Sequence, residues 1–399
     1  MQTTNKRTFL KAACLHCTGI AGVLTSVGAL GQDRASAASA SISELAGRRL
    51  ERPTLETEEG GLWDSMDRAE SRLRKSPMRV PDKALTAYLQ ELVCRIGGEH
   101  CTDIRVHVVR TPLFNATMAP NGMVQIWTGL LLRVENEAQL AAIVGHELGH
   151  YLQRHSLERL QTIKSRAAFA QFMGAFGLVG AIGQLGALAS MYSFSRDQEL
   201  SADRVGMHLM QAAGYDGGQA PQVWTNLLNE LKVTGGEDAG KRSPLFATHP
   251  AVDTRRSELQ ALIKQGPNKL GETEYNAAIA PHRLDWMQDE IKRGQFEESL
   301  AIFDRMLAKN PSDVQATYSR GEVYRLRGGP GDVERALRDL TIAAEAPTCP
   351  PEAFRGLGLV QRQRMDAGSA QAAFQKYLVA SPEAADASLV KSYLADLQP

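Results

Sequence analysis

After residue 61, most of the chain repeats hydrophobic residues at the spacing of an α-helix. In residues 82–96, "DKALTAYLQELVCRI", apolar side chains recur at positions i, i+3, i+4 and i+7 from Leu85, which predicts an amphipathic helix. The segment "DIRVHVVR", from Asp103, instead alternates apolar and other residues. With "NGMVQIWTG", which follows an Asn-Gly turn, it predicts two short strands that pair as a small sheet. A long helix is predicted to begin near Asn136 and to contain "VGHELGHYLQRH".

From residue 282 the pattern changes to recurring pairs of helices. Prolines end segments of this region at intervals of 36 and 35 residues, and glycines recur before them at intervals of 37 residues. These positions are Pro311, Pro347, Pro382, Gly294, Gly331 and Gly368. The periodicity resembles that of tetratricopeptide repeats, whose unit is about 34 residues. We therefore expect a repeat domain over residues 282–399 that binds a protein partner, preceded by a linker over residues 266–281.

Between these parts, residues 167–195 contain no charged side chain, and five of their glycines are spaced three residues apart. The length of this run makes it a candidate for membrane contact, and one face of small residues suits close helix packing. Polar residues such as Gln171 and Gln184 interrupt it. We expect a helical hairpin that is buried or touches a membrane peripherally; a true membrane span and a mobile flap are the alternatives.

Composition places limits on fold and function. The 399 residues, 43% of them hydrophobic, are enough for two domains with separate cores. Aromatic residues make up only 6%, and alanine is common, which favours a helix-rich protein. The net charge is zero, so the chain lacks the basic surface typical of a nucleic-acid-binding protein. The expected fold is mainly α (α+β): a helical domain with a small β-sheet over residues 62–265, followed by an α-helical solenoid.

The first 40 residues are typical of an export signal. A basic start with Lys6 and Arg7 precedes a mildly apolar run, and Ala38-Ser39-Ala40 suits signal peptidase. The segment "KRTFLK" resembles the twin-arginine export motif, with Lys6 in the place of the first arginine. We expect cleavage, with an uncleaved anchor as the alternative, a loose lead-in over residues 41–61, and a mature chain in the periplasm.

Export implies an oxidising compartment, which bears on the cysteines. Cys94 and Cys101 flank "RIGGEH", whose Gly-Gly turn can bring them together as a disulfide; two free thiols are the alternative. Cys349 has no evident partner.

The segment "HELGH" predicts a metal site. His146 and His150 lie four residues apart on a helix and therefore project from one face toward one cation. Glu147 is turned away from His146 by about 100° and suits a base acting on water beside the metal. Zinc in hydrolytic sites takes three protein ligands and keeps one position open, so a third ligand is needed. His155 falls on another face of a continuous helix, so we expect it at the surface.

The segment "QELSADRVG" offers the missing ligand. Glu199 and Asp203 lie four apart on a predicted helix, so Glu199 can bind one zinc ion per chain while Asp203 accepts a hydrogen bond from a ligand histidine. Gly145, Gly149 and Ala202 would let the two helices approach closely. Taken alone, the two acidic side chains would be solvated helix charges; beside "HELGH" we interpret them as part of the site.

HExxH followed by E-x-x-A-D resembles the gluzincin metallopeptidases of the CAAX prenyl protease and HtpX-like family. With the leader and the repeats, the chain is similar to the BepA-like periplasmic subgroup. The resemblance implies that "NATMAPNGMVQIWTGLL" contains an edge strand that pairs with substrate backbone, here Met123, Val124, Gln125, Ile126, Trp127 and Thr128. It also implies that the segment "ATHPAVDTR" places His249 and Arg255 in the active site.

His249 is expected either to donate to the developing oxyanion or to occupy the open position of zinc and hold the enzyme off; the alternative is a plain loop histidine. Arg255 is expected as a second donor or as a brace for His249. The resemblance thus implies an exported zinc endopeptidase that hydrolyses unfolded or misassembled envelope proteins, in quality control of outer-membrane assembly. The alternative is a repeat-based chaperone or adaptor with latent proteolysis.

Overall fold

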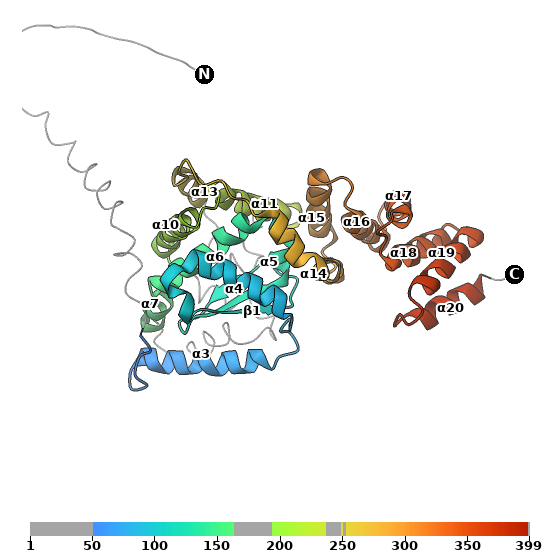
Figure 1. The fold of residues 1–399 in the computed structure, drawn as a ribbon. Helices are drawn as coiled ribbons and strands as arrows, with labels where there is room; N and C mark the ends of the chain where they lie inside the picture. The colour runs from blue at the N-terminus through green and yellow to red at the C-terminus, as the bar shows by residue number, and fades with distance from the viewer. Residues whose placement is uncertain (1–50, 163–193, 237–248, 250–252, 398–399) are drawn as a thin grey trace, which may run out of the picture. The chain divides into compact units, whose positions relative to one another are not determined.

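The computed structural model describes residues 51–162, 194–236, 249 and 253–397 of the chain (Figure 1). The predicted export signal, most of the lead-in and nearly all of the uncharged run 167–195 lie outside these residues. Among the residues that the structure describes, no helix combines the length and the apolar character needed to cross a membrane.

A three-stranded sheet lies at the centre of the N-terminal part. Strands β1 (Arg105–Val109) and β3 (Met123–Trp127) are parallel, and β2 (Ala116–Met118) pairs antiparallel with β3, which gives the order β1-β3-β2. The prediction that residues 123–128 form an edge strand was therefore wrong. The chain between β1 and β3 returns as β2 and covers the open side of β3, and Thr128 is the first residue of a helix.

Helices cover both faces of this sheet, with α3 (Glu58–Arg74) on one side and α4 (Lys83–Gly97) and α6 (Glu137–Leu152) on the other (Figure 1). Leucine and methionine side chains of α3 pack against the odd-numbered residues of β1 and β3. The side chain of Thr57 caps α3 by accepting a hydrogen bond from the backbone N–H of Gly60, so this helix begins inside the expected lead-in.

The 3₁₀ turn η2 (Gly98–Asp103) leads from α4 into β1. A disulfide joins Cys94 to Cys101 across this turn, and Cys349 is a free, half-buried thiol. The side chain of Gln90 donates to the carbonyl oxygen of Ile104 and accepts from the N–H of Val106. Helix α4 is thereby fixed to the start of the sheet.

Six further helices complete the part of this region that the structure describes. They are α5 (Thr128–Arg133), α7 (His155–Thr162), α10 (Arg196–Ala212), α11 (Gln219–Gly235), α13 (Asp253–Ala261) and α14 (Glu272–Lys292). Helix α14 begins inside the stretch 266–281, which was predicted to be a linker and is instead largely helical. The buried guanidinium of Arg133 bonds to Glu230 on α11 and to Glu290 on α14, each at 2.7 Å, and so ties the three helices together.

Six helices follow α14 in the part of the chain that the structure describes. They are α15 (Phe296–Lys309), α16 (Val314–Arg327), α17 (Asp332–Glu345), α18 (Pro351–Gln363), α19 (Ala367–Ala380) and α20 (Ala387–Asp396), and the closest packing is between α16 and α17 and between α18 and α19. Gly294 and Gly331 precede α15 and α17 with φ angles of 70° and 74°, a conformation that favours glycine. The predicted fold class, mainly helical with a small sheet and C-terminal helical repeats, is confirmed.

Candidate metal centre

The site begins with an unusually close contact between α6 and α10. A Cβ atom on Gly149 would lie 2.6 Å from the carbonyl oxygen of Ala202, and one on Gly145 would lie 2.9 Å from that of Gly206. Gly206 in turn has room for hydrogen alone against the backbone of Gly145. The missing side chains allow the two backbones to touch, and the short side chains of α10 can then reach the histidines of α6.

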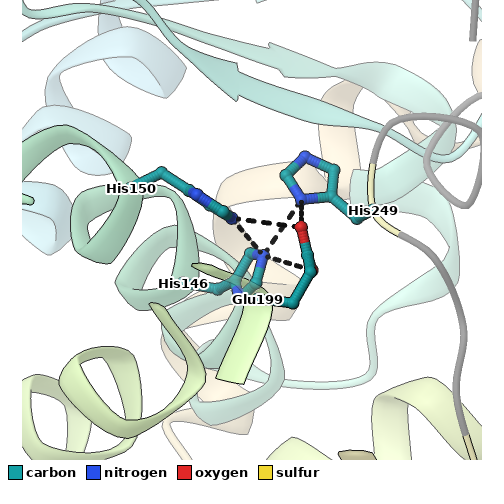
Figure 2. Close-up of side chains that lie close together, drawn as sticks. All are labelled: His146, His150, Glu199 and His249. Atoms are coloured by element: carbon teal, nitrogen blue, oxygen red, sulfur yellow. Dashed lines mark hydrogen bonds and ion pairs between the residues drawn. The ribbon is translucent and has the colours of Figure 1, made fainter. Parts of the chain in front are cut away.

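Four side chains converge where these helices meet: His146 and His150 from α6, Glu199 from α10, and His249 (Figure 2). The Nε2 atom of His146 lies 3.1 Å from Nε2 of His150 and 3.2 Å from Nδ1 of His249. Glu199 Oε1 lies 3.0 Å from the same nitrogen of His249 and 3.4 Å from His150 Nε2. All four residues are buried, with at most 3% of each exposed.

The donor set fits a divalent cation such as zinc. Ligand atoms bound tetrahedrally at about 2.0–2.1 Å lie roughly 3.3 Å from one another, close to the spacing seen here. Charge supports the same conclusion, because Glu147, Glu199 and Asp203 carry three negative charges when ionised and Arg255 carries one positive charge. Buried charges need a partner, and a divalent cation would supply the missing two.

Electrostatics keeps Glu199 and His150 in the forms that a metal binds. Burial alone would raise the pKa of Glu199, but the neighbouring histidines, His249 first, hold its pKa well below its usual range. Burial lowers the pKa of His150 well below the ordinary histidine value, so its imidazole is neutral. The site therefore presents an anionic oxygen and a neutral ring nitrogen.

The side chain of Asp203 holds the outer nitrogen of His146. His146 Nδ1 lies 2.8 Å from Asp203 Oδ1, so this N–H donates to the carboxylate and Nε2 is left free for a metal. Burial opposes ionisation of Asp203, but Arg255 outweighs it and lowers the pKa to about 2. Arg255 donates to both oxygens of Asp203, lies 2.9 Å from Glu199 Oε2, and stacks over Trp224.

These contacts differ from the expected role of Arg255. Within the described part of the chain, Arg255 makes its polar contacts with the carboxylates of Asp203 and Glu199 and with His146, so it is placed to brace Asp203 and Glu199 rather than to bond an oxyanion or His249. Trp224, which lies beneath the guanidinium, was missed by the sequence analysis. No spacing pattern connects α11 to this site, so the sequence carried no signal for it.

His155 is also placed differently from its prediction. It is buried, and its Nδ1 lies 2.8 Å from Nδ1 of His150. The prediction of a surface histidine assumed one continuous helix, but α6 ends at Leu152 and α7 begins at His155. Between them, Arg154 adopts a φ angle of 59°, which turns the chain back toward the site.

Glu147 lies beside both this cluster and β2, whose outer edge pairs with no other strand in the ranges that the structure describes. Its carboxylate accepts a hydrogen bond from the N–H of Met118 on β2, while Oε1 finds no hydrogen-bond partner among the described residues and lies 3.6 Å from Nε2 of His249. Burial raises the pKa of Glu147. The edge strand beside the site is thus β2, in the "NAT" segment of the stretch that the resemblance had identified, a few residues earlier than predicted.

Comparison with known proteins identifies the family of this arrangement. Residues 80–263 match the model of peptidase family M48, and residues 284–330 match a tetratricopeptide repeat model. The chain carries an M48 peptidase domain. All the proposed ligands, Glu147, Asp203 and Arg255 lie within the matched residues, and M48 peptidases depend on a metal.

The chain is also similar to several known proteases. The putative beta-barrel assembly-enhancing protease of Vibrio cholerae is 28% identical over 49% of this chain and 42% of its own length. The Escherichia coli beta-barrel assembly-enhancing protease is 28% identical over 48% of this chain and 42% of its own length. The mitochondrial metalloendopeptidase OMA1 of Arabidopsis thaliana is 33% identical over 39% of this chain and 30% of its own length. The chain thus spans less than half the length of each of these three relatives.

The close helix contact predicts the effect of one methyl group. Gly149→Ala would force α6 and α10 apart, which we expect to cost roughly 1–3 kcal/mol in the free energy of unfolding and to weaken metal binding. Gly61→Ala is the matched control, because a Cβ there meets nothing within 4 Å on the exposed face of α3. Urea unfolding of both variants measures the free energy of unfolding, and zinc titration measures their metal affinity. Equal behaviour of the two would show that the contact does not shape the site.

Proposed function

We propose that this chain is an exported, zinc-dependent endopeptidase that hydrolyses peptide bonds of unfolded or misassembled envelope proteins. The observation that carries the proposal is the convergence of His146, His150 and Glu199 on one point, with Glu147 beside it. The M48 domain and the metalloendopeptidases among its relatives support the reaction. The leader-like first 40 residues support export to the periplasm, with the relatives named for beta-barrel assembly as the precedent for substrates.

His146, His150 and Glu199 would hold one zinc ion per chain, with Asp203 fixing the ring of His146. When bound, zinc would supply Lewis-acid activation of water and of the substrate carbonyl. Glu147 takes the proton of the attacking water at Oε1, the oxygen without a partner, and later returns it to the leaving amide nitrogen. The N–H of Met118 keeps the other oxygen of this carboxylate in place.

The free edge of β2 is the proposed binding line for substrate backbone. The register pairs Ala116, Thr117 and Met118 with Ile126, Gln125 and Val124, respectively. In an antiparallel ladder the flanking bonds, Trp127 to Asn115 and Ala119 to Met123, leave the backbone groups of residues 116 and 118 pointing away from β3. The N–H of Met118 already donates to Glu147, so an extended peptide can add there as a further strand through the N–H and C=O of Ala116 and the C=O of Met118. This mode selects unfolded chains, since a native protein rarely offers a free extended segment.

His249 is proposed to hold the enzyme off at rest. Its Nδ1 lies within 3.2 Å of both His146 Nε2 and Glu199 Oε1, the position of a fourth ligand. A hydrolytic zinc site needs this position open. Substrate access therefore requires His249 to leave; donation to the developing oxyanion is the alternative role of this residue.

His249→Ala distinguishes its two roles. If the histidine blocks a site that is open about one tenth of the time, its removal raises the hydrolysis of an unfolded test protein by about tenfold. The measurement is the initial rate of the zinc-loaded enzyme on reduced, carboxymethylated casein, with His208→Ala on α10 as the control. A fall in rate with His249→Ala alone would contradict blocking and assign it to the oxyanion.

The repeat helices suit a second, non-catalytic surface. We propose that they bind a protein partner, and that residues 167–195 contact the membrane peripherally. A second candidate function, a chaperone or adaptor with latent proteolysis, is favoured by these repeats and by the occupied fourth position at the site.

Glu147→Gln decides between the two functions. It removes the proton acceptor and keeps the shape, so we expect at least a 100-fold loss of casein hydrolysis with zinc content and unfolding temperature unchanged. Glu91→Gln, on the exposed face of α4, is the control. Cells that carry only Glu147→Gln should accumulate misassembled envelope proteins. Full complementation by that variant would contradict the peptidase as the primary function and favour the adaptor.

A further inference from the structure

The second ligand histidine also has a buried partner, one that the HExxH pattern does not include. His150 Nδ1 and His155 Nδ1 lie 2.8 Å apart, with the two rings inclined at 70°. Only one proton fits between two ring nitrogens at this distance. One imidazole is therefore the donor and the other the acceptor.

A metal decides the direction of this bond. If Nε2 of His150 offers its lone pair to a metal, the neutral ring carries its proton on Nδ1. That N–H must then donate to Nδ1 of His155, whose own proton lies on Nε2. We propose that His155 is a positioning residue that fixes the tautomer and the ring orientation of His150, as Asp203 does for His146. This inference rests on the metal site proposed above.

The surroundings of both rings keep His150 and His155 in contact. Arg154 has a left-handed φ angle of 59°, which separates α6 from α7 and brings residue 155 back over residue 150. His155 is only 5% exposed. Phe194 stacks on the ring of His150 at 3.9 Å between centroids, so rotation of the imidazole is limited on a second side.

The partner of each histidine has a different chemistry. Asp203 is an anionic acceptor that is held by Arg255, whereas His155 is a neutral one. A hydrogen bond to an outer nitrogen orients the ring and raises its strength as a ligand, and loss of such a partner costs about 10–100-fold in metal affinity. His155 should therefore matter for metal affinity without touching the metal.

Three substitutions at residue 155 test the proposal. Asn places its Oδ1 where the Nδ1 of histidine was, Gln places its oxygen one bond farther out, and Leu offers no acceptor. Each full-length apoprotein is titrated with zinc against a chromophoric chelator, and its unfolding temperature is measured without metal. The absorption spectrum of the cobalt-loaded form reports on ligand geometry. His100→Asn, a buried site in η2, is the control.

We expect His155→Leu and His155→Gln to bind zinc about 10–100-fold more weakly than wild type, with a changed cobalt spectrum. We expect His155→Asn to stay close to wild type in both. Equal affinity of the Asn and Gln variants, whatever its value, would overturn the proposal, and this comparison holds even if the Leu variant does not fold. A wild-type protein that binds no zinc would instead contradict the proposed function itself.

Discussion

The backbone contact between α6 and α10 is the constraint on which the site depends. Gly145 and Gly149 line one side of α6, and Ala202 and Gly206 face them from α10. A helix pair separated by ordinary side chains lies 8–10 Å apart, axis to axis. Here the smallest residues remove that spacing, so Glu199 and Asp203 reach both the metal-facing and the outer nitrogens of the histidines on α6.

This arrangement concentrates charge in a region without solvent. Carboxylates at 147, 199 and 203 lie among buried histidines, and among the described residues Arg255 is the permanent positive charge that contacts them. Such a set is costly without a cation and favourable with one, so folding and metal binding should be linked. The buried Arg133 shows how the fold balances such a charge at a structural site. Its guanidinium forms ion pairs with Glu230 and Glu290, which come from two other helices.

The spacing of residues along the chain predicted the two helices that carry the site better than it predicted the strand and the turn beside them. Helical spacing was enough to place His146, His150, Glu199 and Asp203 on two facing surfaces, because four residues make nearly one turn. The pairing of strands could not be predicted in this way, since β2 has only three residues and too little periodicity to identify. The position of His155 was predicted wrongly for a related reason. Arg154 adopts a positive φ angle just after α6, and an arginine side chain gives no signal for that conformation.

The most direct test of the proposed site is the metal content of the purified protein, measured by inductively coupled plasma mass spectrometry after dialysis against metal-free buffer. Glu199→Gln, measured alongside it, removes one anionic ligand and keeps the shape of the side chain. The account predicts about one zinc ion per wild-type chain and a much weaker affinity in the variant. A wild-type chain without zinc, or a variant that retains zinc with undiminished affinity, would contradict it.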